Sequence, residues 1–237
     1  VVCGLLIAMA LAGGWVYATG PAGWMPLIIV VWTAALIVFY DYAGKYLVAL
    51  GLLSLGLIRF FNAMAAAPGL PMIWQPLLLL NHVTLLSLVA YHWEQKRPSL
   101  TRVHWWSVIG GLGGIDALLI GIIAWRRSST GGTIAAALEI RSGLWWPAAA
   151  VAAFVIIAII IRRRSATSRE AGQRLMLYGL LWLILYDAAF AEGYIGWGPA
   201  VVLLALLPAA YFSVQLMRWW GGVIALTHRP AFQRVEI

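Results

Sequence analysis

The sequence predicts an all-α, polytopic transmembrane helical bundle, and three observations lead to this prediction. Of the 237 residues, 63% are hydrophobic and only 10% are charged, whereas a soluble domain has roughly 25% charged residues. The apolar residues form about eight runs, each long enough to cross ~30 Å of hydrocarbon as a helix. The lysines and arginines gather in the short segments between these runs. We therefore expect membrane lipid to be the solvent of this surface.

The predicted spans follow one another through short connections and form a single integral membrane domain over residues 1–237. Each is expected to be helical, because only a helix satisfies its own backbone hydrogen bonds within lipid. Trp and Tyr residues mark many of the ends, where their rings prefer the headgroup level. The longest connection, 126–143, is expected to be a loop or to hold a short interfacial helix at 134–140. The spans are predicted at 1–18, 25–40, 46–66, 72–92, 105–125, 144–161, 175–193 and 199–217.

The distribution of positive charge predicts the orientation of the chain. Alternating the connections between two faces places twelve basic residues on one face and three on the other. Because cytoplasmic loops carry the excess of Lys and Arg, the first face and the C-terminus are assigned to the cytoplasm, in a bacterial inner membrane. The net charge of +8 is thereby explained by an anionic leaflet, and no nucleic-acid partner is expected. The twelve are Lys45, Lys96, Arg97, Arg102, Arg162, Arg163, Arg164, Arg169, Arg174, Arg218, Arg229 and Arg234, and the three are Arg126, Arg127 and Arg141.

One basic residue, Arg59, lies inside a predicted span, with Asn62 nearly one turn later on the same helix face. A charge near the bilayer centre costs ~2.5–3.5 kcal/mol, so its side chain must face protein or a cavity. One interpretation is a cationic group that holds an anion such as a diphosphate. The other is an ion pair between helices, for which Asp116 and Asp187 are available.

Other polar residues in the spans are better explained by packing than by chemistry. We expect Asp116 and Asp187 to pair within the bundle. His82 has no second intramembrane histidine for a bis-histidine haem, so a hydrogen-bonded histidine at a helix contact is favoured over a ligand. Gly110 and Gly114 form a GxxxG pattern, which permits a close helix contact. No Walker A, GxGxxG, GxSxG or HExxH motif is found.

Two connections on the predicted cytoplasmic face carry the remaining candidate site residues. The segment 91–105 holds Glu94, Lys96 and Arg97, and the earlier segment 40–45 ends in Lys45. Each cation is explained by anchoring to the leaflet. Alternatively, Lys45, Arg59 and Arg97 line one cavity that opens to the cytoplasm and takes an anionic headgroup or a diphosphate.

Several stretches resemble UbiA-type intramembrane prenyltransferases. The run 35–51, with Tyr40 at a span end and Lys45 in the following turn, resembles the stretch that joins the fourth and fifth helices of that family. Gly56–Asn62, which contains Arg59, is similar to the GxxRxxN stretch of a bacterial UbiA-like subgroup, and the region of Asp187 and Pro208 resembles its C-terminal end. The likeness covers residues 1–105 most fully, and the order of the motifs carries it.

The resemblance implies transfer of a prenyl group from a prenyl diphosphate to a lipophilic acceptor. It also implies Mg²⁺ held by two Asp-rich motifs, with Lys45, Arg59, Asn62, Lys96 and Arg97 at the diphosphate. The first motif is expected upstream of Val1, in a part that precedes this sequence, because the chain enters from the cytoplasm and starts without Met. The second falls at 91–105, where Glu94 is the one carboxylate available for metal.

The weak second motif leaves another function open. In this second hypothesis, the chain is a non-catalytic subunit of a larger membrane complex. It binds lipid, quinone or pigment, or acts as a scaffold. Four spans follow the 91–105 segment, where the resemblance implies three. No inverted repeat of the kind found in secondary transporters is seen.

Overall fold

The computed structural model confirms the all-α bundle. It describes residues 8–15, 23–66, 73–96, 98–128 and 138–227, and these contain helices and turns but no strand. Seven helical segments are long and apolar enough to cross a membrane. The remaining predicted span, 1–18, which is the first along the chain, lies mostly outside the described residues, although its residues 8–15 are helical. The predicted interfacial helix at 134–140 also lies mostly outside them.

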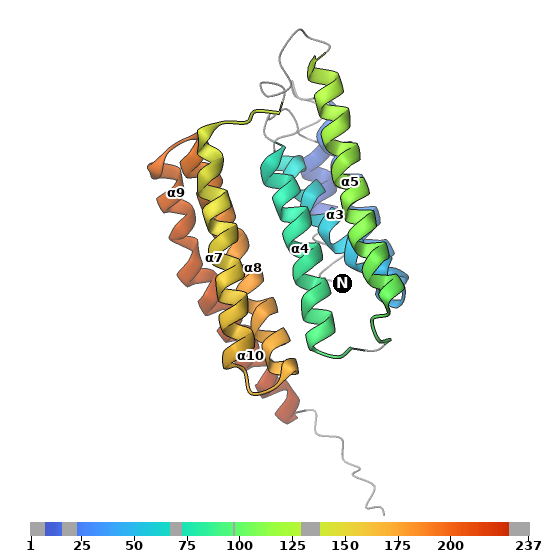
Figure 1. Cartoon of the computed structure of the whole chain (residues 1–237), viewed down its shortest axis with the longest axis vertical. Coiled ribbons are helices and arrows are strands. Elements are labelled where there is room, and N and C mark those ends of the chain that lie inside the picture. Colours follow the sequence, from blue (N-terminus) through green and yellow to red (C-terminus); the bar gives the residue numbers. More distant parts are fainter. Residues whose placement is uncertain (1–7, 16–22, 67–72, 97, 129–137, 228–237) are drawn as a thin grey trace, which may run out of the picture.

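The helices form two groups in Figure 1. The first group contains α2 (Met25–Tyr42), α3 (Val48–Ala66), α4 (Trp74–Trp93) and α5 (Arg102–Ser128), with the short 3-10 helix η1 (Gly44–Tyr46) between α2 and α3. The second contains α7 (Trp145–Arg164), α8 (Ser168–Tyr194), α9 (Trp197–Leu204) and α10 (Leu206–Thr227), preceded by η2 (Ser142–Leu144). The contact between α4 and α8 joins the two groups.

Helix α4 is the centre of the bundle. Residues covering 61% of its span are buried inside the protein, against 33% or less for each of the other six spans. It packs against α3, α5 and α8. Much of the core lies between α3, α4 and α5, with Phe60, Leu80, Leu88 and Val108 almost fully buried. The position of α4 therefore decides how the two groups of helices are held together.

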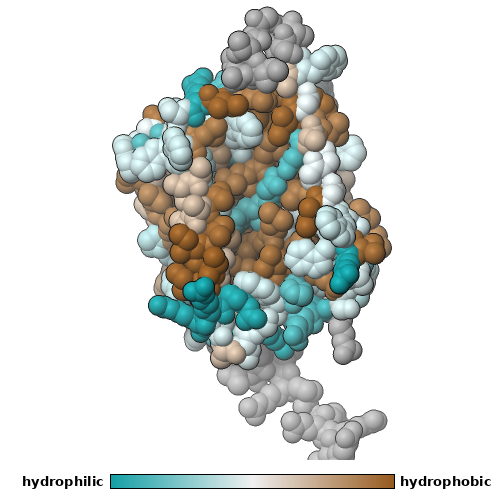
Figure 2. Space-filling view, in the orientation of Figure 1, coloured by the Kyte–Doolittle hydropathy of each residue, from teal (hydrophilic) through white to brown (hydrophobic). Residues whose placement is uncertain are grey.

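The outer surface is largely apolar, as lipid contact requires (Figure 2). Large side chains such as Trp32, Ile156, Val202 and Phe212 are between 58% and 68% exposed. A water-soluble monomer rarely leaves contiguous apolar patches of this extent uncovered. The hydrophobic runs thus face outward as well as inward, in agreement with a membrane protein.

Close backbone approaches hold α4 against its neighbours. A Cβ atom on Gly56 of α3 would meet Thr84 Oγ1 and would lie 2.7 Å from the carbonyl oxygen of Leu80, both on α4. On the α8 side, a Cβ on Gly172 would lie 3.0 Å from the carbonyl oxygen of Ala90. The predicted contact at Gly110 and Gly114 is not found among the described residues, because both positions have open space around them. Gly111 instead faces Leu53 of α3.

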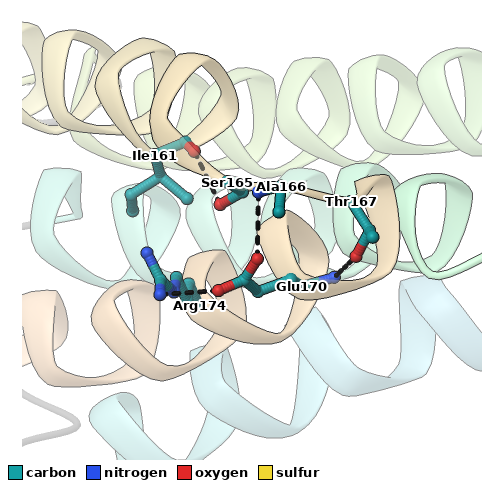
Figure 3. Close-up of polar contacts among 6 residues, drawn as sticks. All are labelled: Ile161, Ser165, Ala166, Thr167, Glu170 and Arg174. Atoms are coloured by element: carbon teal, nitrogen blue, oxygen red, sulfur yellow. Dashed lines mark hydrogen bonds and ion pairs between the residues drawn. The ribbon is translucent and has the colours of Figure 1, made fainter.

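Helix α8 begins seven residues before its predicted span, because of its N-terminal cap (Figure 3). Thr167 Oγ1 accepts a hydrogen bond from the backbone N–H of Glu170 at 3.1 Å. Glu170 Oε2 accepts from the N–H of Ala166 at 3.0 Å, while its Oε1 pairs with Arg174 Nη2 at 2.6 Å. A Thr followed three residues later by Glu is an N-terminal capping signal. Arg169 and Arg174 therefore lie on the first turns of a helix rather than in a loop.

The last predicted span, 199–217, is divided into two helices. Helix α9 ends at Leu204 and α10 begins at Leu206, four and two residues before Pro208. Proline has no N–H to donate to the carbonyl four residues earlier, and its ring crowds that carbonyl. The interruption beside Leu204 is thus the expected effect of Pro208.

Candidate functional site

Those basic residues of the first predicted face that the structure describes lie at one end of the bundle. This end, here called the basic end, consists of the connections 43–47, 94–101 and 165–167 with the helix turns beside them, and it is the lower end in Figure 1. Arg141 lies at the opposite end, in the connection before η2. The structure therefore places the basic loops at the same end, because alternate connections of an up-and-down bundle lie at the same end.

Two candidate residues of the basic end, Glu94 and Lys96, are paired with each other. Lys96 Nζ lies 3.0 Å from Glu94 Oε2, and the Glu94 side chain is only 13% exposed. A Cβ on Gly172 would lie 2.7 Å from Glu94 Cγ, so Glu94 packs over the start of α8. The carboxylate predicted to hold metal is thus partly covered and neutralised by a cation.

A Mg²⁺ site would need several oxygen ligands around an open position. The described residues contain no group of three or more His, Cys, Asp or Glu side chains that is close enough to hold a metal ion. Glu94, partly covered by α8 and paired with Lys96, does not by itself fit such a site. No step of a reaction is therefore assigned to a metal held by these residues.

A polar cavity of about 350 Å³ lies beside this pair. Its wall includes His92, Gln95, Lys96, Ser99 and Ser168, and it carries no carboxylate among the lining residues. Gln95 has a φ angle of +53°, which is uncommon for a non-glycine residue. The cavity offers hydrogen-bonding groups to a polar ligand, and the one ammonium group in its wall, that of Lys96, is already paired with Glu94.

Lys45 and Arg97 do not complete a shared site in the described part of the chain. Lys45 lies in η1, is exposed, and has its Nζ 5.2 Å from the ring centroid of Tyr46. Arg97 lies outside the described residues. The rise along α3 from Val48 to Arg59 is about 17 Å, so Lys45 and Arg59 lie at different depths of the bundle.

Arg59 and Asn62 lie together on the least covered face of α3. Both side chains are exposed, whereas Gly56 and Phe60, on the other side of the helix, are buried. Within the part of the chain that the structure describes, no hydrogen bond or ion pair of Arg59 is found. The predicted interhelical ion pair is therefore not formed with either Asp116 or Asp187.

Those two aspartates instead accept hydrogen bonds from amides of α4. Gln75 Nε2 donates to Asp187 Oδ1 of α8 at 2.8 Å. Asn81 Nδ2 donates to Asp116 Oδ1 of α5 at 3.0 Å, and also to its own helix at the carbonyl of Leu77. The expectation that both aspartates pair within the bundle is confirmed. The sequence did not identify the partners, because a helix face cannot be matched to its neighbour without the rotation of both helices.

His82 forms a buried hydrogen-bonded contact between α4 and α8. Its Nε2 lies 3.0 Å from the carbonyl oxygen of Gly179, which can only accept, so Nε2 carries the proton. Nδ1 then accepts from the hydroxyl of Tyr186 at 3.1 Å. The ring also packs against Phe154 of α7, with centroids 4.6 Å apart. Both ring nitrogens are occupied, so the structure supports the helix-contact interpretation.

One buried carboxylate oxygen lies near the C-terminal end of α8. Glu192 has an Oε2 atom that is buried without a hydrogen-bond partner among the described residues. The nearby connection bonds to both groups of helices, because Trp74 Nε1 donates to the carbonyl of Leu138 at 2.6 Å and the Tyr194 hydroxyl donates to that of Glu139 at 3.2 Å. Nothing in the residue types of this segment predicts these contacts.

Comparison with known proteins gave no relative from which a function can be read. No family model matches the chain, and neither a curated protein nor a solved structure does.

Proposed function

We propose that this chain belongs to an intramembrane prenyltransferase of the UbiA type, which transfers a prenyl group from a prenyl diphosphate to a lipophilic acceptor. The observation that carries the proposal is the exposed Arg59 and Asn62 pair on α3, inside a membrane span. These two residues also belong to the GxxRxxN stretch on which the resemblance rests.

Arg59 lies within a membrane span without a charged partner among the described residues. A cation at this depth costs ~2.5–3.5 kcal/mol unless it meets an anion, a dipole or water. The carboxylates of Asp116 and Asp187 are already bonded to the amides of Asn81 and Gln75. An anionic substrate group is a partner that would recover this cost, and Asn62 adds an amide donor beside it. Arginine suits such a role because its guanidinium matches phosphate oxygens in a bidentate geometry.

The basic end would attract the same ligand. It collects Lys45, Lys96 and the three arginines in the last turn of α7, and a cluster of one sign raises the local concentration of the opposite charge. We assign this end to the cytoplasm, where water-soluble diphosphates are made available to the membrane. The apolar bundle surface would accommodate the prenyl tail in lipid.

In the transfer, the bond between C1 of the prenyl chain and the diphosphate oxygen breaks, and its electron pair leaves with the diphosphate. The acceptor forms a new bond to C1 and loses a proton. Because negative charge develops on the leaving oxygen, a cation held in place there lowers the barrier. Arg59 is the residue that we place at this group. A dependence on Mg²⁺, implied by the resemblance, belongs to the same proposal.

The test is release of pyrophosphate by the intact protein, reconstituted in lipid nanodiscs with a prenyl diphosphate, Mg²⁺ and a panel of lipophilic acceptors. Arg59→Gln should lower the rate by ~10²–10³, the usual effect of removing one charge-stabilising donor. Arg169→Gln is the matched control, since Arg169 is exposed on the first turn of α8. An inactive wild-type protein that also fails to bind prenyl diphosphate would refute the proposal.

One observation favours a second candidate. Glu94, the one carboxylate in the segment where a metal-binding motif was expected, is already paired with Lys96. A non-catalytic member of the same kind would bind an anionic amphiphile through Arg59 without turnover. Stable co-purification with a larger membrane complex, with ligand binding but no pyrophosphate release, would identify that case.

A further inference from the structure

A second feature of the basic end lies between the two groups of helices and away from Arg59. Helices α4 and α7, both described in full, each pack closely against α8. Their backbones do not approach each other in the same way, and side chains such as His82 and Phe154 make the contact between them. The space between them forms an apolar groove of about 340 Å³. Its walls include Val89 and Trp93 of α4 and Phe154 and Ala158 of α7, and its mouth is formed by Arg162 and Arg163.

The groove is apolar along most of its walls and basic at its mouth, which matches a ligand with an apolar chain and an anionic head. Apart from the two arginines, its named walls are apolar, and Phe154 at the inner end packs on the buried ring of His82. At the mouth, the Arg162 guanidinium lies 5.6 Å from the ring centroid of Trp93. Figure 2 shows hydrophilic residues along the lower edge of this face and mostly hydrophobic ones directly above them, with a diagonal stripe of hydrophilic residues across the middle.

The length of the groove corresponds to one leaflet. Eight residues separate Phe154 from Arg162, which is about 12 Å along a helix axis. One leaflet contributes about half of the ~30 Å hydrocarbon thickness. A ligand that fills the groove from its charged mouth would therefore extend through much of one leaflet, which is the reach of an acyl chain rather than of a spanning partner helix.

The charges at the mouth select the headgroup. Arg162 and Arg163 are exposed, and among the described residues no carboxylate lies within ion-pair distance of either. Glu170, the acidic residue of the adjoining α8 turn, is taken up by Arg174 and by the Ala166 N–H. Basic pockets between membrane helices on the cytoplasmic side recognise anionic phospholipids.

We infer that the groove between α4 and α7 is a binding site for one anionic phospholipid. Arg162 and Arg163 contact the phosphate, and an acyl chain lies along Trp93, Ala158 and Phe154. The bound lipid fills the gap that α8 leaves between the two groups of helices. This inference is independent of any transferase activity, because it involves neither Arg59 nor Asn62.

The test compares lipids by native mass spectrometry of the full chain released from detergent. We expect one phosphatidylglycerol to be retained in preference to phosphatidylcholine, and free glycerol phosphate not to bind. The double variant Arg162→Gln/Arg163→Gln should weaken retention about 30-fold, since each basic residue near an anionic surface contributes a factor of roughly five. Arg169→Gln, on the same end but outside the groove, should retain the lipid as the wild type does.

A second variant separates the groove from the charges. Ala158→Phe fills the space for the acyl chain, leaves both arginines in place, and should also lower retention of phosphatidylglycerol. Size-exclusion profiles check that each variant is folded. Equal retention of phosphatidylglycerol and phosphatidylcholine, or unchanged retention in both variants, would overturn the inference. Displacement of the lipid by a prenyl diphosphate would overturn it too, because the groove would then belong to the substrate.

Discussion

The side-chain amide of Gln75 in α4 donates a 2.8 Å hydrogen bond to the carboxylate of Asp187 in α8. This bond crosses the interface between α4 and α8, through which the two groups of helices are joined. Together with the bond from Asn81 to Asp116, it makes α4 the partner of both intramembrane aspartates. The polar groups of the spans thus stabilise the bundle through α4, while Arg59 is left out of these pairs.

The energy of this bond can be measured by a double-mutant cycle. Asp187→Leu leaves the Gln75 amide without its partner and should destabilise the protein, and Gln75→Leu should do the same. Interhelical hydrogen bonds in membranes contribute about 0.6 kcal/mol on average and up to about 1.7. We expect a coupling free energy in that range from unfolding in mixed micelles. Additive effects of the two substitutions would show that the bond contributes nothing.

The contact between His82 and Tyr186 gives a second prediction. Tyr186→Phe removes the donor to Nδ1 while keeping the ring, and should cost about 1 kcal/mol. The imidazole should remain in the tautomer with the proton on Nε2, because the Gly179 carbonyl accepts from it. Nitrogen-15 chemical shifts of His82 test this assignment. A spectrum with the proton on Nδ1 would contradict the described contact.

The glycines of α3 and α5 make a matched pair for a third prediction. Gly56→Ala places a methyl group against Thr84 and the Leu80 carbonyl, and overpacking of this kind typically costs 1–3 kcal/mol. Gly114→Ala adds a methyl group to open space and should be neutral, or should stabilise the helix by up to about 1 kcal/mol. Thermal unfolding in detergent compares the two. Equal destabilisation would mean that Gly114 packs against another helix.

Thr167 gives a fourth prediction, on the early start of α8. Thr167→Ala removes the acceptor of the Glu170 N–H and should cost about 0.5–2 kcal/mol, as loss of an N-cap residue does. Thr167→Ser keeps the hydroxyl and serves as the control. Hydrogen exchange should rise at the first turn of α8 in the alanine variant alone. Unchanged exchange at Glu170 would show that the cap does not hold this turn.

The sequence predicted the fold well because the patterns that define a spanning helix are local. A long apolar run, aromatic residues at its ends and basic residues beyond them lie within one segment, and α2, α3, α4 and α7 follow their predicted spans closely. The early start of α8 and the division beside Pro208 are also local, and the capping and proline rules account for both.

Contacts between helices were not predictable in the same way. Gly110 and Gly114 form the expected GxxxG pattern, yet the structure uses Gly111 and Gly56 for close approach. Which glycine faces a neighbour depends on the rotation of two helices, and one helix alone does not contain that information. The same limit applies to the candidate site. The sequence placed Arg59 with Asn62 correctly on one face, but could not show that Glu94 pairs with Lys96.

The most direct test of the whole account is the sidedness of two connections. Cys3 is the only cysteine, so Cys3→Ser provides a background for single-cysteine variants. Ala166→Cys in the α7–α8 connection and Ser142→Cys before α7 are both exposed positions at opposite ends of α7. A membrane-impermeant maleimide should label Ala166→Cys only from the cytoplasmic side and Ser142→Cys only from the other. Labelling of both from one side of sealed vesicles would contradict the spanning bundle.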